Sequence, residues 1–114
     1  MAIRVTIIRP LPGRREEALE TLEALDQALA GRPGLLESSV LSDAGVPGSG
    51  LVGRISQWVS RERADQEAQD PRVLALRARL MGVTAERSVD TLFDVESAAS
   101  GLPREPAGLL FPAA

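Results

Sequence analysis

Five residue types are missing from this chain of 114 residues: histidine, cysteine, tyrosine, lysine and asparagine. Without cysteine the chain can form no disulfide, no thiolate nucleophile and no thiolate metal site. Without histidine as well, transition metals lose their nitrogen and sulfur donors, and haem iron has no usual axial ligand. Schiff-base chemistry requires a lysine, and acid–base work would fall to aspartate and glutamate. We therefore expect no bound metal and no cofactor.

The chain also lacks a strong charge of either sign and any long apolar run. Its net charge is −3, all 13 basic residues are arginine, and pairs such as Arg14-Arg15 are interleaved with glutamates. A nucleic-acid surface needs clustered positive charge, so we expect no nucleic-acid partner. No apolar segment is long enough to span a bilayer, and the N-terminus carries no signal-peptide pattern. These patterns predict a cytoplasmic protein with no membrane association.

The hydrophobic pattern changes period along the chain and predicts seven elements. Alternating β-branched segments predict strands, and apolar residues at helical spacing predict helices. The expected strands are 3–8, 35–42, 51–59 and 87–96, and the expected helices are 14–29, 60–68 and 70–82. The order is β-α-β-β-α-β with the second helix broken in two, which is the ferredoxin-like plan of an α+β protein. It gives a four-stranded antiparallel sheet with helices on one face.

One domain accounts for residues 1–96, and residues 97–114 have the composition of a tail. The tail holds the apolar cluster Leu109-Leu110-Phe111, which would be costly to leave in water. We therefore expect the tail to be partly docked on a surface. Residues 43–50 are rich in turn formers, and this loop is either a simple connection or a lid.

Two features of the predicted strands bear on packing. Strict alternation along 35–42 would put Leu36 and Val40 on one face of the sheet and Leu35 on the other. Gly53, in the middle of its strand, indicates a bulge or a close approach by another backbone.

The first, third and fourth strands carry apolar or large residues on both sides. A chain this short has no second helical layer to cover the face of the sheet that the helices leave open. A second sheet must cover it, so we expect a homodimer formed by sheet-to-sheet packing.

One block in the middle of the chain resembles a known family. Trp58-Val59-Ser60-Arg61-Glu62-Arg63-Ala64 is followed by Asp70-Pro71 and then by Val73-Leu74-Ala75-Leu76. This block resembles the antibiotic biosynthesis monooxygenase family of dimeric α+β barrels, and the resemblance covers residues 1–96. The spacing of 13 residues from Trp58 to Pro71 is similar to the family pattern. The resemblance implies a cofactor-independent monooxygenase that acts on a small hydrophobic or aromatic metabolite.

The chain departs from the family at several functional positions. Many members carry a histidine in the short helix, where this chain has Glu67 and Ala68. The haem-degrading branch uses that histidine and an asparagine of strand one, so haem degradation is disfavoured. The quinone-forming branch uses tyrosines and an asparagine, which are absent here. Two other functions therefore stay open: a non-catalytic ligand-binding or structural homodimer, and an isomerase or lyase with a buried carboxylate base.

Four residues are candidates for the functional site. Trp58, Arg54 and Gln57 are candidate ligand-binding residues, and Trp58, Arg54 and Glu67 are candidate catalytic residues. Trp58 matches the family tryptophan and would form an aromatic pocket wall, or else it anchors the core or an interface. Gln57 could donate or accept a hydrogen bond to a ligand.

The two charged candidates also have structural interpretations. Arg54, or Arg4, could supply the arginine that the family uses. If Arg54 is buried, it needs a carboxylate, and Asp90 or Asp94 on the last strand could provide it, with anion binding as the second interpretation. Glu67 could act as a base if burial raised its pKa, or it is a solvated helix residue.

Overall fold

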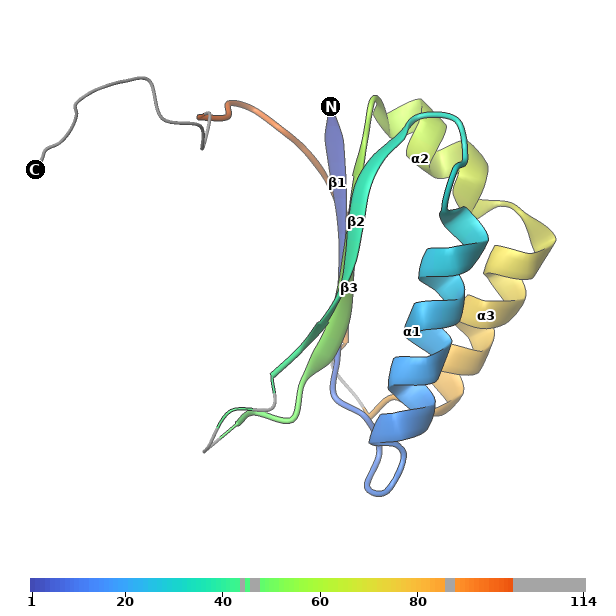
Figure 1. Cartoon of the computed structure of the whole chain (residues 1–114), viewed down its shortest axis with the longest axis vertical. Helices are drawn as coiled ribbons and strands as arrows, with labels where there is room; N and C mark the ends of the chain where they lie inside the picture. Colours follow the sequence, from blue (N-terminus) through green and yellow to red (C-terminus); the bar gives the residue numbers. More distant parts are fainter. Residues whose placement is uncertain (44, 46–47, 86–87, 100–114) are drawn as a thin grey trace, which may run out of the picture.

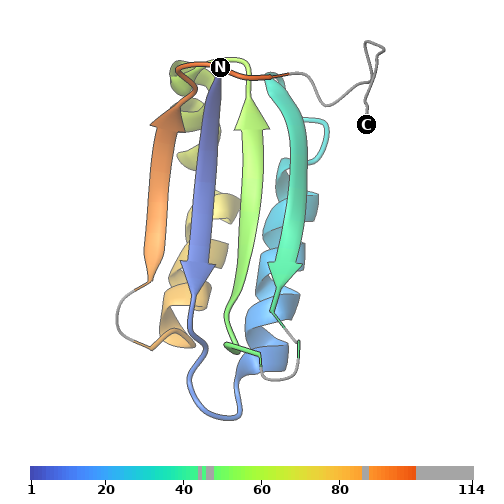
Figure 2. The ribbon, with the colours of Figure 1, turned by 90° about the vertical axis from the view of Figure 1, so that its left-hand side faces the viewer.

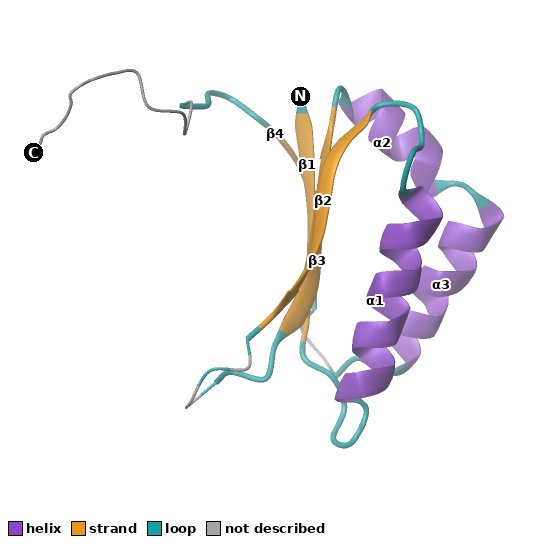
Figure 3. Cartoon of the chain, viewed as in Figure 1, coloured by secondary structure: helices purple, strands orange, loops and turns teal. Residues whose placement is uncertain are grey.

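The computed structural model describes residues 1–43, 45, 48–85 and 88–99, which form one sheet covered by helices on one side (Figure 1). The described part of the chain runs β-α-β-β-α-α-β, as Figure 3 shows by element type. The elements are β1 (Ala2–Ile8), α1 (Arg15–Leu29), β2 (Leu35–Ser42), β3 (Val52–Trp58), α2 (Arg61–Ala68), α3 (Pro71–Gly82) and β4 (Val89–Asp94). The sheet is antiparallel throughout, in the order β2-β3-β1-β4 (Figure 2). The ferredoxin-like α+β prediction is confirmed.

Both short helices begin where their capping residues predict. Ser60 precedes α2, and its hydroxyl accepts a hydrogen bond from the backbone N–H of Arg63 at 3.1 Å. Asp70 precedes α3, and its carboxylate accepts from the N–H groups of Arg72 and Val73. Pro71 at the first position of α3 is pre-set for helical geometry and needs no hydrogen-bond acceptor.

The pairing register divides the sheet into a helix-facing side and an open side. On β1 the side chains of Ala2, Thr6 and Ile8 are buried against the helices, while Val5 pairs with Ile55 on the open side. The core lies between the sheet and helices α1 and α3. Its members with no more than 2% of their surface exposed include Ile8, Ala18, Leu22, Val52, Val73 and Leu80.

The predicted face assignment in β2 is wrong. A register shift between Leu35 and Glu37 interrupts the pairing with β3. An extra residue in one strand moves the side chains of the residues before it to the opposite face of the sheet. Leu35 and Val40 therefore both pack against the core, and Leu36 is left 54% exposed.

Gly53 confirms the expectation of a close approach by another backbone. A Cβ at this position would collide with the backbone carbonyl oxygen of Thr6 on β1. Only a residue without a side chain fits there, so glycine permits the tight β1–β3 pairing in the middle of the sheet.

Two of the four predicted strands are slightly too long. The strand expected over 51–59 spans Val52–Trp58, and that expected over 87–96 spans Val89–Asp94. The predicted docking of Leu109-Leu110-Phe111 lies outside the described residues, as do parts of the loop over 43–50. No helix within the described ranges is long and apolar enough to cross a membrane.

Candidate functional site

A cavity of about 200 Å³ lies between the helix layer and the helix-facing side of the sheet. Most of its wall is apolar and comes from all three helices and the end of β3. These apolar residues are Leu22, Leu25, Leu29, Trp58, Ala64, Ala68, Val73, Ala78, Leu80 and Met81. The rest of the wall is polar and comes mainly from the strands: Arg4, Thr6, Arg54, Ser56, Arg77 and Asp90. Such a cavity suits a small molecule with an apolar body and one polar end.

Strand alternation explains why the polar groups gather. Thr6 of β1 pairs with Arg54 of β3 on one side and with Asp90 of β4 on the other. Arg4, two residues earlier on β1, pairs with Ser56 in the same way. Side chains two residues apart share a face, so the sheet presents these five as one polar floor beneath the helices.

Arg54 is a buried cation that is only partly paired. Its side chain is 6% exposed, and its Nε donates to the carboxylate of Asp26 on α1 at 2.9 Å. The expectation of a partner on the last strand is therefore wrong, because the carboxylate comes from the helix above. The Nη2 of Arg54 is buried and has no hydrogen-bond partner among the described residues. Burial lowers the pKa of Arg54, the bond to Asp26 opposes this, and repulsion from Arg4 adds to it.

Asp90 links three other groups of the cavity wall. Its carboxylate accepts a hydrogen bond from the Thr6 hydroxyl at 3.2 Å and forms an ion pair with Arg77 of α3. Arg4 lies 3.6 Å away on the same carboxylate. Asp94, by contrast, pairs with Arg61 at 3.1 Å near the end of the strand.

The two other arginines of the wall also have lowered pKa values. Burial is the largest cause for Arg4, and the nearby charge of Asp65 opposes it. Burial is again the largest cause for Arg77, followed by repulsion from Arg4 and Arg54. Three guanidinium groups that repel one another across a small apolar cavity make it electropositive.

Trp58 lies on the cavity wall and in the hydrophobic core at once. It is 2% exposed, and its indole Nε1 donates to the Ser56 hydroxyl at 3.0 Å. That bond satisfies the one polar atom of the indole and fixes the ring against the cavity.

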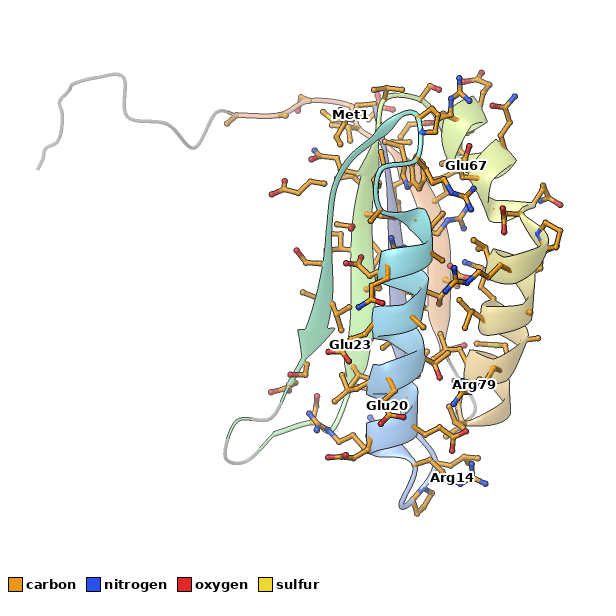
Figure 4. All side chains as sticks on the ribbon, turned by 45° about the vertical axis from the view of Figure 1, so that its right-hand side comes forward. Met1, Arg14, Glu20, Glu23, Glu67 and Arg79 are labelled. Carbon is orange, nitrogen blue, oxygen red and sulfur yellow. The ribbon has the colours of Figure 1, made fainter. Side chains whose placement is uncertain are left out.

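The remaining two candidates lie away from the cavity wall. Gln57 points to the open side of the sheet, where it lines a shallow hollow with Ile3 and Ile55. Glu67 is at the end of α2 (Figure 4), and its carboxylate accepts from Arg32 at 2.6 Å. Arg32 also donates to Asp70 at 2.9 Å, so these three charges join the ends of α1, α2 and α3. Hydrogen bonds to Glu67 and Asp70 raise the pKa of Arg32.

Sequence reasoning did not identify Arg77 or Asp26 as members of this site, and it named Asp90 only as a possible partner of Arg54. A signal for Arg77 exists, because it lies four residues after Val73 within the core-facing stripe of α3. No comparable signal points to Asp26, since α1 carries many acidic residues. No group of three or more potential metal ligands is found within the described ranges.

Comparison with known proteins adds information on the fold. No protein-family model matches the sequence, and no curated protein is significantly similar to it. Among solved structures, Rv0793 from Mycobacterium tuberculosis is similar, with a TM-score of 0.76 and 19% identity over 87% of this chain and 98% of that chain. A Deinococcus radiodurans protein provisionally assigned as an antibiotic biosynthesis monooxygenase has a TM-score of 0.77 and 16% identity, over 90% and 100% of the two chains.

SnoaB from Streptomyces nogalater, a cofactor-independent oxygenase, has a TM-score of 0.69 and 15% identity over 85% of this chain and 94% of that chain. This chain has the same α+β fold as these proteins. The likeness extends over nearly the whole length of these proteins, so the fold resemblance inferred from the Trp58 block is confirmed. At 15–19% identity the likeness shows a common fold.

Proposed function

We propose that this protein is a cofactor-independent monooxygenase that acts on a small hydrophobic, aromatic metabolite. The observation that carries the proposal is the buried, incompletely paired Arg54 on the wall of a largely apolar cavity. A buried cation without a full set of acceptors is costly, and an anionic substrate or intermediate would supply the missing one. The neighbouring solved structures include a cofactor-independent oxygenase, which supports the same reaction class.

In this reaction the substrate itself would supply the electrons that reduce dioxygen, and the protein would stabilise the negative charge on the substrate. When an anthrone-type phenol reacts with dioxygen, one oxygen atom becomes a carbonyl at the methylene carbon. The methylene hydrogens leave with the second oxygen atom as water. The substrate supplies all the electrons that dioxygen takes up, so no further reductant is needed. Arg54 and Arg4 would lower the pKa of the bound phenol, so that its proton passes to solvent, and would stabilise the anion that forms. The leucine-lined wall with Trp58 would exclude water during the reaction with dioxygen.

Oxygen uptake with purified protein tests this function. We expect the parent protein to consume dioxygen with anthrone and to release the quinone, which is followed by absorbance. Trp58→Phe should lower the rate by loss of wall contacts, and Arg54→Met should lower it by about tenfold or more, through loss of charge stabilisation. Arg14→Met, the same chemical change at an exposed pair with Glu17, serves as the control. No uptake by the parent protein across a panel of phenols would reject an oxygenase.

A non-catalytic ligand-binding protein is the second candidate, and one observation favours it. Asp90 is the only carboxylate on the described cavity wall, and it is already bound by Arg77 and Thr6. An isomerase or lyase would need this same carboxylate as its base, because Glu67 lies outside the wall. Retained binding of a ligand without any turnover would support the second candidate.

The open side of the sheet supports our proposal of a homodimer. Its side chains include Ile3, Val5, Ile7, Ile55, Val89 and Phe93. Phe93 is 51% exposed and Val89 47%, and no described helix covers this side (Figure 2). Contiguous apolar surface of this kind marks an interaction site. Light scattering should give twice the chain mass of 12.1 kDa, and a monomer at micromolar concentration would contradict the proposal.

A further inference from the structure

We propose that the preferred ligand of the cavity is an aromatic carboxylate, a monoanion that arrives already ionised. This inference rests on the proposed function only in placing the ligand in the same cavity. It narrows the ligand from a hydrophobic metabolite to an apolar acid, with its carboxylate against Arg54 and Arg4 and its ring against Trp58.

The charges around the cavity set the charge of the ligand. Three guanidinium groups, those of Arg4, Arg54 and Arg77, lie on the wall. Two carboxylates are in contact with them: Asp90 with Arg4 and Arg77, and Asp26 with Arg54. The three arginines together with Asp26 and Asp90 therefore carry a net charge of +1. This net charge favours a ligand with a single negative charge.

A third carboxylate approaches the group but contributes less. Asp65 lies 3.7 Å from Arg4, and its side chain is 59% exposed. A pair of this kind is screened by water and has little energetic weight. The excess positive charge therefore lies with Arg4 and Arg77, which share the carboxylate of Asp90, while Arg54 beside them is paired with Asp26 through its Nε alone.

The hydrogen-bond donors set the kind of anion. The Nη2 of Arg54 has no acceptor within the described chain, although it is buried. Guanidinium groups match the two oxygens of a carboxylate, and these charge-assisted bonds are stronger than neutral ones. The Ser56 hydroxyl, on the same side of β3, accepts from Trp58 and so has its own proton to donate.

The cavity wall has no group suited to ionise the ligand. Its polar members within the described ranges are three arginines, two hydroxyls and Asp90, which is already bound by Arg77 and Thr6. Neutral phenols have pKa values of about 10, whereas carboxylic acids ionise at about pH 4. At neutral pH a carboxylic acid therefore brings its own charge, and a phenol does not.

The apolar wall excludes small or highly charged anions as the preferred ligand. Leu22, Leu25 and Leu80 of the helices line the same cavity as the arginines. Burial of an aromatic ring against them contributes through the hydrophobic effect, which acetate or sulfate would not gain. Phosphate would also bring a second negative charge, which the charged residues around the cavity do not balance.

Isothermal titration calorimetry with the purified full-length protein tests the inference. The probes are 1-naphthoate and its neutral isostere 1-naphthamide, both at pH 7. We expect 1-naphthoate to bind at least about tenfold more tightly, because a hydrogen bond to a charged group is worth about that factor. Acetate and sulfate, which carry charge without a ring, should bind more weakly than 1-naphthoate.

Variants then assign the binding to this cavity. Arg54→Met should abolish the preference for 1-naphthoate over 1-naphthamide, and Arg54→Lys should keep part of it. Arg14→Met, on the exposed face, should change neither affinity. If Arg54→Met fails to fold, the comparison of the two probes on the parent protein still decides the question.

The outcomes separate this inference from the proposed oxygenase function. Equal affinity for the two probes, or no binding of either, overturns the inference, whatever the oxygen uptake. Preferential binding of 1-naphthoate supports it, even where the oxygen-uptake panel shows no turnover. A preference that survives Arg54→Met would also overturn it.

Discussion

Arg54 is a charged residue inside the protein, and Asp26 is the only carboxylate bonded to it among the described residues. When one member of a buried ion pair is removed, the other is left without compensation, and this costs more than the pair itself contributes. We predict that Asp26→Ala destabilises the fold by about 2–4 kcal/mol, measured by urea unfolding.

The double variant provides the control for that prediction. Asp26→Ala together with Arg54→Met removes both charges, so it should recover a large part of the lost free energy of unfolding. If the double variant is as unstable as the sum of the two single variants, the pair is not energetically coupled.

Gly53 gives a second prediction at the scale of one residue. A methyl group there would meet the backbone of β1 at Thr6, which cannot move without disturbing the sheet. Gly53→Ala should therefore destabilise the protein by about 1–3 kcal/mol. Gly82→Ala is the matched control, because nothing lies within 4 Å of its added Cβ. Thermal unfolding of both variants checks the difference, and equal melting temperatures would contradict it.

At the scale of elements, the junction of the three helices depends on Asp70. Its pKa is lowered mainly by the hydrogen bond from Arg32, with help from the backbone N–H groups of Val73 and Arg72. The folded-state pKa is thus below the unfolded value of about 4. The stability that follows from this shift is present above pH 4 and is lost as the pH falls through the folded-state pKa.

We predict that Asp70→Asn, which keeps the helix cap but not the charge, is less stable than the parent at pH 7. The difference in the free energy of unfolding should shrink as the pH falls below about 4, because the parent carboxylate then becomes neutral as well. Glu62→Gln, in the first turn of α2, is the control. A difference that stays constant from neutral to acidic pH would contradict the prediction.

The elements themselves were largely predictable, and their side-chain partners were not. Ser60, Asp70 and Pro71 have local preferences that place the helix starts without any tertiary information. The shift at Leu36, in contrast, arises from how β2 fits β3, and no local preference encodes it. The partner of Arg54 depends on how α1 lies over the sheet, so a sequence that offers several carboxylates cannot select Asp26.

In the candidate site too, the features set by local pattern were predictable and those set by tertiary packing were not. Strict alternation along residues 51–59 puts Arg54 and Trp58 on one face of the sheet and Gln57 on the other, and the structure has this arrangement. Arg77 reaches the cavity wall only because α3 packs against the sheet, and the sequence does not encode that packing locally. The family resemblance makes Glu67 a candidate, because many members of that family have a histidine near this position, but the carboxylate of Glu67 is bound by Arg32 at the helix junction.

At the scale of the whole molecule, one side of the sheet is covered and the other is not. We predict that Phe93→Glu converts a dimer into a folded monomer, because this side chain is 51% exposed in a single chain and its loss removes no core contact. Leu74→Glu, the same change at a side chain 47% exposed on α3, should leave the mass unchanged. Light scattering with circular dichroism checks both, and an unchanged mass for Phe93→Glu would contradict the prediction.

The position of Trp58 has an optical consequence. It is the only tryptophan, and the sequence has no tyrosine, so ultraviolet fluorescence reports on this one indole without tyrosine emission. Its ring forms part of the cavity wall, so a molecule that enters the cavity changes the surroundings of the fluorophore. A molecule bound on the open side of the sheet is separated from it by the strands. The emission of this protein is therefore a built-in sensor of cavity occupancy, and it requires no label.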